Sequence, residues 1–255
     1  MRKHISFSEL KTWYECAFKH KLVYIDKIKQ FKGSEHTAFG TAMHYVCENV
    51  FDQKNNLSTM FQQKFLEELT MLKQDNVDLN KKLISEMRIQ GDKMLAHILP
   101  AVKQMFPVFE VISVEEELYV PLEDGSNFKG FIDLVLKVDE TYHIIDWKTC
   151  SWGWDSKRKS DRMTTYQLTL YKHFFAKKHN IDPDNIETHF ALLKRTAKSN
   201  NVEIFRVTSG MKKTENAVKL LKKALYNIKK SNHIKNRLSC TSGYGCEFYQ
   251  TEHCM

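Results

Sequence analysis

The stretch HIIDWKTC, residues 143–150, places charged groups inside a run that is otherwise typical of a buried β-strand. Asp146 and Lys148 interrupt the apolar residues of this run. Side chains two residues apart on a strand point to the same face, so the carboxylate and the amine are predicted to lie side by side. Because an unpaired buried charge is unfavourable, another charged group or a cation must lie opposite this pair.

The preceding predicted strand contains a second carboxylate. In GFIDLVL, Asp133 interrupts an apolar run as Asp146 does. If the two strands form a hairpin, the carboxylates converge, and they repel each other unless a cation lies between them. Oxygen ligands of this kind favour magnesium or manganese, and Lys148 would lie beside the metal. The alternative is ordinary: a single acidic residue often marks a strand end or a surface position, and Asp146 could simply pair with Lys148.

The period of the apolar residues changes along the chain from helical to alternating. Ser6 to Glu9 reads S-x-x-E, a capping box that opens a first helix. The pattern then predicts helices at 41–53, 59–74 and 81–99 (ending at Pro100), strands at 108–120, 128–138 and 141–148, a helix at 161–179, strands at 186–195 and 202–208, and a helix at 212–231. This order predicts an α/β fold, with a mixed central β-sheet flanked by helices, an N-terminal helical section and a Cys-rich C-terminal tail.

The charge of the chain is compatible with a polyanionic partner. Lysine and arginine number 39 against 31 acidic residues, which gives a net charge of +8. Nucleic acid is one such partner, although a merely solvated basic surface is the alternative. Basic residues cluster locally after residue 150, and we expect Arg158 and Lys159 in the first of these clusters to contact nucleic acid.

The chain shows no sign of a membrane or secretory location. No run approaches 18 apolar residues, so no membrane span is expected. The N-terminal sequence MRKHISFSELK lacks the apolar segment of a signal peptide. An intracellular, reducing location is therefore expected, and there the six cysteines are free, metal-bound or cluster-bound rather than paired as disulfides.

Four motifs occur in the order found in one enzyme family. GFIDLVL followed by IIDWKT resembles the G-x-I-D and D-x-K strands of the PD-(D/E)xK nuclease superfamily, in its RecB-type branch. FGTAMH at 39–44 resembles the G-x-x-x-H motif of that branch, and Gln167, Leu168 and Tyr171 resemble its Q-L-x-x-Y helix. The N-terminal SFSELKTWYECAFKHKL resembles the opening helix of the branch, with alanine where proline is usual.

The resemblance implies a restriction-endonuclease-like core and a set of site residues. The implied metal ligands are His44, Asp133, Asp146 and the carbonyl group of Trp147, and the implied catalytic residues are Asp133, Asp146 and Lys148. Gln167 and Tyr171 would help to hold the substrate; they are i and i+4 on one helix face. The metal would be Mg²⁺ or Mn²⁺, and an imidazole beside two carboxylates favours manganese.

The cysteines near the two chain ends suggest a second metal centre. Some members of the branch, including AddB and the CRISPR-adaptation nucleases, bind a 4Fe–4S cluster through one N-terminal and three C-terminal cysteines. The resemblance assigns such a cluster to Cys16, Cys240, Cys246 and Cys254. The spacing here is C-x5-C-x7-C, which is wider than in the family. Zinc, with His253 as an additional ligand, and free thiols are the alternatives.

The predicted function is a metal-dependent DNA nuclease, with an exonuclease favoured over an endonuclease, in DNA replication, recombination or repair. The alternative is a non-catalytic nucleic-acid-binding subunit that retains the nuclease fold; such proteins usually lose an acidic residue or the lysine, and all are present here. A zinc-dependent nucleic-acid adaptor is a further alternative. The chain has no G-x-x-x-x-G-K-[ST] motif, so a separate helicase or recombination protein is the expected partner besides DNA.

The length of the chain suits one large domain. We expect a single nuclease domain at 1–255, with a mainly helical N-terminal part at 1–105, the nuclease core at 106–210, and a C-terminal helix and Cys-rich tail at 211–255. The expected location is cytoplasmic, in a protein of bacterial or phage origin. The mitochondrial genome maintenance exonuclease shares the DWKT form, but the sequence shows no clear transit peptide.

Overall fold

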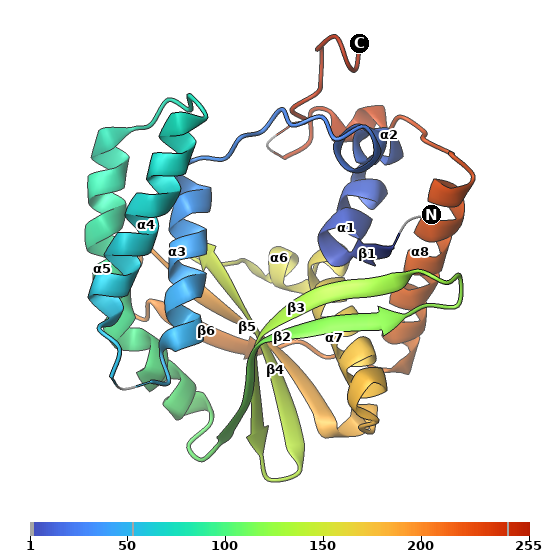
Figure 1. Cartoon of the computed structure of the whole chain (residues 1–255). Coiled ribbons are helices and arrows are strands. Elements are labelled where there is room, and N and C mark those ends of the chain that lie inside the picture. Colours follow the sequence, from blue (N-terminus) through green and yellow to red (C-terminus); the bar gives the residue numbers. More distant parts are fainter. Residues whose placement is uncertain (1–2, 53, 244) are drawn as a thin grey trace. The chain divides into compact units, whose positions relative to one another are not determined.

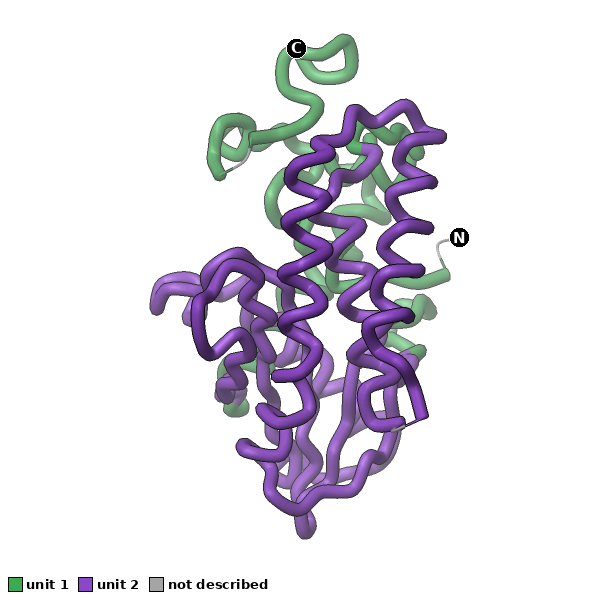
Figure 2. Tube along the Cα trace, turned by 90° about the vertical axis from the view of Figure 1, so that its left-hand side faces the viewer, with its two compact units in different colours: residues 1–31, 119–130, 210–255 green, residues 32–118, 131–209 purple. Residues whose placement is uncertain are grey.

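A computed structural model describes residues 3–52, 54–243 and 245–255, and the chain divides into two compact units (Figure 2). Unit 1 comprises Met1–Phe31, Tyr119–Gly130 and Gly210–Met255, and unit 2 comprises Lys32–Leu118 and Phe131–Ser209. Each unit therefore combines segments that are distant in the sequence. The predicted single domain at 1–255 stays a prediction.

The strands of the described residues form one mixed sheet of six strands, which confirms the predicted α/β class (Figure 1). Its order is β1-β3-β4-β5-β6, and β2 pairs with β3. β4 is antiparallel to β3 and parallel to β5, and β6 is antiparallel to β5. The strands are β1 (His4–Ser6), β2 (Glu110–Pro121), β3 (Asn127–Val138), β4 (Thr141–Cys150), β5 (Ile186–Lys194) and β6 (Val202–Arg206). The sequence analysis did not predict β1, which has only three residues.

Helices cover both faces of the sheet in unit 2. Alternate residues of β4 show this: Ile145 and Trp147 lie in the apolar core with residues of α3, α4 and α5, whereas the side chain of Asp146 contacts α7. In Figure 1, α3–α5 lie side by side. The helices are α3 (Glu35–Asn49), α4 (Leu57–Gln74), α5 (Lys81–Met105), α6 (Ser156–Ser160) and α7 (Arg162–His179), with a 3₁₀ turn η2 (Pro183–Asn185) before β5.

Unit 1 contains the first and last helices of the chain. They are α1 (Phe7–Glu15), α2 (Ala17–His20), a π-helical turn η1 (Lys21–Ile25), α8 (Met211–Lys229) and a 3₁₀ turn η3 (Arg237–Ser239). The first half of the predicted capping box is present at the start of α1, where Ser6 Oγ accepts the backbone N–H of Glu9 at 3.2 Å. Glu9 Oε1 lies 2.7 Å from Nε2 of the buried His20.

Two predicted helix boundaries are wrong. α3 begins at Glu35 rather than 41 and ends at Asn49, and Gln53, the last residue predicted for it, lies outside the described residues. α5 continues through Pro100 to Met105, although it was predicted to end there. Proline removes one helical hydrogen bond, but buried apolar residues on both sides of it keep the helix packed on the core. No described helix combines the length and the apolar character needed to span a membrane.

Candidate active site

Asp146 and Lys148 lie on one face of β4. Asp146 is only 1% exposed, and its Oδ2 lies 2.5 Å from Lys148 Nζ. Phe190 of β5 is in register with Asp146, and Lys148 Nζ lies 5.9 Å from the centre of its ring. The side chain of Lys148 is 30% exposed. The ammonium group is therefore held beside a buried carboxylate while it can still meet a ligand from solvent.

Asp133 lies where the pairing of β3 with β4 ends. The regular ladder runs from Val138–Thr141 to Leu134–Ile145. Just beyond the last pair of this ladder, the side chain of Asp133 forms the hydrogen bond to β4: its Oδ2 accepts the backbone N–H of Trp147 at 2.6 Å. This bond fixes the second carboxylate next to the D-x-K strand. Whether the carbonyl group of Trp147 ligates a metal stays a prediction.

His44 reaches the same point from α3. Its Nδ1 lies 3.6 Å from Asp133 Oδ2. Gly40, one turn earlier, lies so close to β4 that a Cβ atom there would be 3.3 Å from Thr149 Oγ1. Glycine thus permits the close approach of helix and strand that brings His44 to the carboxylates. Burial opposes the charged imidazole, but the hydrogen bond and charge of Asp133, with the charge of Asp146, raise the pKa of His44 above its ordinary value.

Two further carboxylates, Glu48 and Glu115, belong to this site, and the sequence analysis missed both. Glu48 follows His44 by one helical turn on α3. Burial, together with the charge of Asp133, raises the pKa of Glu48. Glu115 lies on β2 with a φ of +51°, which is rare for a residue with a side chain. Burial of its carboxylate and the charges of Asp133 and Glu48 raise the pKa of Glu115 to about 7.

The electrostatics of the site fit a divalent cation. Burial raises the pKa of Asp146 to about 6, with Lys148 opposing and Asp133 reinforcing the change. Burial is the main cause of the raised pKa values of Asp146, Glu48 and Glu115, and the charge of Asp133 adds to it in each case. Carboxylate oxygens with one imidazole form a donor set suited to Mg²⁺ or Mn²⁺.

The predicted substrate-binding pair of α7 contacts the buried carboxylate. Gln167 Nε2 donates to Asp146 Oδ1 at 2.7 Å and lies 3.3 Å from the hydroxyl oxygen of Tyr171. Burial and the charge of Asp146 raise the pKa of Tyr171, so its hydroxyl group stays protonated. The two residues are one turn apart on α7, as the sequence analysis expected. In this structure Gln167 holds the Asp146 carboxylate, and contact of either residue with a substrate stays a prediction.

A model of the PD-(D/E)XK nuclease superfamily matches residues 4–254 of the chain. The chain belongs to the PD-(D/E)XK nuclease superfamily. Members of this superfamily use divalent metals, in agreement with the carboxylate-rich site. The mixed sheet flanked by helices is consistent with its restriction-endonuclease-like fold.

One solved structure supports the fold of this nuclease. A crystal structure from Eubacterium rectale, described as "Putative exonuclease", has a TM-score of 0.60 at 12% identity; the match covers 94% of this chain and 86% of that one. At this identity the likeness concerns the fold alone. SSO0001 gives a TM-score of 0.38 at 14% identity, with 91% of each chain covered. No curated protein sequence matches the nuclease.

The basic residues predicted to contact nucleic acid lie on and around α6 of the nuclease. The guanidinium group of Arg158 is exposed and lies 4.6 Å from the centre of the Trp154 ring. Lys159 instead forms an ion pair with Glu203, whose other oxygen lies 3.1 Å from Lys194 Nζ. The charge of Lys159 is therefore partly compensated within the protein, whereas that of Arg158 faces solvent.

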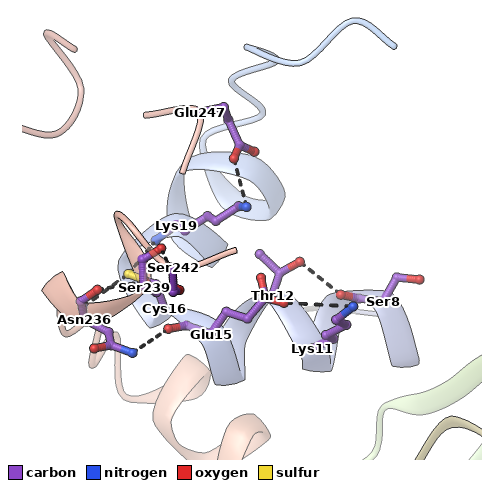
Figure 3. Close-up of polar contacts among 10 residues, drawn as sticks. All are labelled: Ser8, Lys11, Thr12, Glu15, Cys16, Lys19, Asn236, Ser239, Ser242 and Glu247. Atoms are coloured by element: carbon purple, nitrogen blue, oxygen red, sulfur yellow. Dashed lines mark hydrogen bonds and ion pairs between the residues drawn. The ribbon is translucent and has the colours of Figure 1, made fainter. Parts of the chain in front are cut away.

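The four cysteines assigned to a cluster line one cavity of unit 1, with a volume of about 430 Å³. The cysteines are Cys16, Cys240, Cys246 and Cys254, and all are free thiols. Figure 3 shows Cys16 at the junction of α1 and α2, beside the segment that carries Asn236 and Ser239. Cys16 Sγ accepts the backbone N–H of Asn236 at 3.3 Å.

The spacing of these sulfur atoms bears on which metal they suit. Tetrahedral zinc at about 2.3 Å from sulfur needs ligand atoms about 3.8 Å apart. In the part of the chain that the structure describes, no three of the cysteine sulfurs and His253 nitrogens come within 4.8 Å of one another. A 4Fe–4S cluster is larger than one ion and holds its thiolates farther apart. The binding of a cluster in this cavity stays a prediction. The other two cysteines, Cys47 and Cys150, lie in unit 2.

Proposed function

We propose that this chain is a divalent-metal-dependent deoxyribonuclease of the RecB-type branch, and that it removes nucleotides from DNA ends in replication, recombination or repair. The observation that carries the proposal is the meeting of His44, Asp133, Asp146 and Lys148 at one place on β3, β4 and α3. The superfamily supports nuclease chemistry, and the exonuclease name of the Eubacterium rectale protein supports action at ends.

His44, Asp133 and Asp146 would hold the metal, and Glu48 and Glu115, whose pKa values respond to the charge of Asp133, would be additional candidate ligands. Bound Mg²⁺ or Mn²⁺ would polarise the scissile phosphate and lower the pKa of a coordinated water. Without metal, the same carboxylates would repel the DNA backbone. Metal binding is therefore expected to be required for tight DNA binding at the site as well as for cleavage.

Besides holding the metal, the protein would assist cleavage through Lys148 and through Gln167 of α7. The Lys148 ammonium group is fixed by Asp146 and partly open to solvent, so it can stabilise the negative charge that develops on the phosphate. Gln167 holds the Asp146 carboxylate from the other side, which limits its rotation. Arg158 and the neighbouring basic residues would bind the DNA backbone, because phosphate contacts need no base recognition.

Cleavage of labelled oligonucleotides tests this function. Single- and double-stranded DNA, labelled at the 5′ or the 3′ end, is incubated with the full chain and Mg²⁺, Mn²⁺ or EDTA. We expect metal-dependent shortening from an end with wild type and with Asp78→Asn, an exposed acidic control, and none with Asp146→Ala. DNA binding by wild type without cleavage in either metal would contradict the proposal and favour the non-catalytic subunit.

We also propose that Cys16, Cys240, Cys246 and Cys254 hold a 4Fe–4S cluster that links the chain ends within unit 1. Anaerobically purified protein should be brown and contain iron and sulfide. Cys16→Ser should lose iron and stability, whereas Cys150→Ser, outside the cavity, should keep both. Zinc in place of iron would support the alternative centre, and colourless protein with neither metal would exclude both.

DNA is the proposed substrate, and a separate helicase or recombination protein is the proposed partner, since the chain carries no P-loop motif of its own. Such a partner would supply unwound or resected ends. A DNA substrate also places the proposed activity inside the cell, as the expected cytoplasmic location requires.

A further inference from the structure

Two histidines and a glutamate converge on the sheet face opposite to Asp146. His143 of β4 is in register with Glu187 of β5, and Ile145 is in register with His189. Residues two apart on a strand share a face, so His143, Glu187 and His189 project together. His143 and Asp146 are three residues apart on the same strand, so they project to opposite faces. This group is therefore separate from the carboxylate site.

The distances in this group are close to those of a metal site. His143 Nδ1 and His189 Nε2 are 3.1 Å apart, and Glu187 Oε2 lies 3.8 Å from each of them. A tetrahedral ion at about 2.0–2.2 Å from nitrogen and oxygen needs ligand atoms about 3.4 Å apart. Shifts of a few tenths of an ångström would therefore seat the ion. Among the described residues, this is the one group of three His, Cys, Asp or Glu side chains whose ligand atoms all lie within 4.8 Å of one another.

The surroundings hold the ligands in place. His143 and His189 are 8% and 1% exposed, and the ring of Phe106 lies 4.7 and 5.3 Å from theirs. Arg206 Nη2 lies 2.8 Å from Glu187 Oε1 and leaves Oε2 facing the imidazoles. Such an outer contact orients a carboxylate ligand.

We propose that His143, Glu187 and His189 bind a zinc-type transition-metal ion that joins β4 to β5. Two imidazoles and one carboxylate suit zinc, cobalt or nickel rather than magnesium. Three protein ligands leave one position for water, and the sulfur-free donor set separates this site from the cysteines. By joining the two strands, the ion would stabilise the strand that carries Asp146 and Lys148. The proposal does not depend on the nuclease activity.

Cobalt and zinc titrations of the full chain test the proposal. After chelation and removal of the chelator, protein in millimolar Mg²⁺ is titrated with Co²⁺, and visible absorption and bound metal are measured. We expect His189→Gln to bind one equivalent less than wild type. His97→Gln, an exposed histidine of α5, should match wild type. Cobalt–thiolate absorption, which reports the cysteines, should be equal in all three proteins.

Glu187→Gln keeps the test decisive if His189→Gln does not fold, because Glu187 is partly exposed. Loss of one ligand should weaken zinc binding at this site at least about tenfold, as even the loss of an outer contact does. The zinc-induced rise in melting temperature should shrink accordingly. Equal zinc affinity in Glu187→Gln and wild type would overturn the proposal and leave the histidines as a buried hydrogen-bonded pair.

Discussion

Replacing Asp146 by asparagine should stabilise the metal-free protein while it abolishes cleavage. Asp146 is 1% exposed, and burial raises its pKa from 3.8 to about 6. The difference corresponds to an unfavourable free energy of about 3 kcal/mol for the charged folded state. Asparagine removes the charge but still buries an amide, whose oxygen can accept from Gln167. We therefore expect the free energy of unfolding to rise by about 1–3 kcal/mol, or the melting temperature by roughly 2–10 °C.

The pH dependence gives this prediction its sign. A raised pKa means that the folded state binds the proton more tightly than the unfolded state, so wild-type stability falls as pH rises between about 4 and about 6. The stability of Asp146→Asn should not fall over this pH range for this reason, because asparagine carries no titrating proton there. The stability difference between the two proteins should be near zero below pH 4 and complete above pH 6.

Thermal unfolding in EDTA at pH 4 and pH 7 measures both quantities, with Asp78→Asn as the exposed control that should not change. Adding Mg²⁺ should then stabilise wild type by mass action and leave Asp146→Asn unchanged. A variant that is less stable than wild type in EDTA at pH 7, or a difference independent of pH, would refute the reasoning.

Three further predictions concern the same site and the basic residues of α6 that are proposed to bind DNA. Lys148→Ala should keep metal and DNA binding but cleave about 10²–10⁴-fold more slowly, as calorimetry beside a cleavage assay would show; full activity would contradict the role of the lysine. Wild-type Mn²⁺ affinity should rise as pH passes about 7, because Glu115 must lose its proton to ligate, and Glu115→Gln should flatten this rise between pH 6 and 8. Arg158→Ala should reduce the slope of log DNA affinity against log salt concentration by about one phosphate contact. Lys159→Ala should reduce it by less, because Glu203 already pairs with Lys159. An unchanged slope for Arg158→Ala would exclude a phosphate contact by Arg158.

Local periodicity explains which parts of the fold could be predicted. The strands that carry Asp133 and Asp146 are apolar runs with five consecutive buried residues each, and the strand period of two fixes which of their side chains share a face. The start of α3 was missed for a local reason too. Its cap is S-x-x-T, in which the backbone N–H of Ser34 donates to Thr37 Oγ1 at 2.9 Å, and this is a weaker sequence signal than S-x-x-E. The end of α5 was missed because proline predicts a break that core packing overrides.

The two missed carboxylates differ in how far the sequence could have shown them. Glu48 is four residues after His44, so the helical period alone places it on the same face, and that signal was available. Glu115 is the first of three consecutive glutamates, and nothing in the sequence separates it from Glu116, which pairs with Lys178 and His179 instead. Its place depends on a positive φ and on residues far along the chain, which no local pattern encodes.

The alternation of β4 links the catalytic site to the apolar core. Its residues Ile145 and Trp147 are fully buried among α3–α5, while Asp146 and Lys148 project toward α7. A shift of one residue in the pairing of β4 would exchange these faces and move the carboxylate into the apolar core. The burial of Trp147 therefore fixes the register that the chemistry requires. The same alternation places His143 on the core side of β4 and Asp146 on the other side. The imidazole of one proposed metal site and the carboxylate of the other therefore lie on opposite faces of the sheet, although the two residues are only three positions apart.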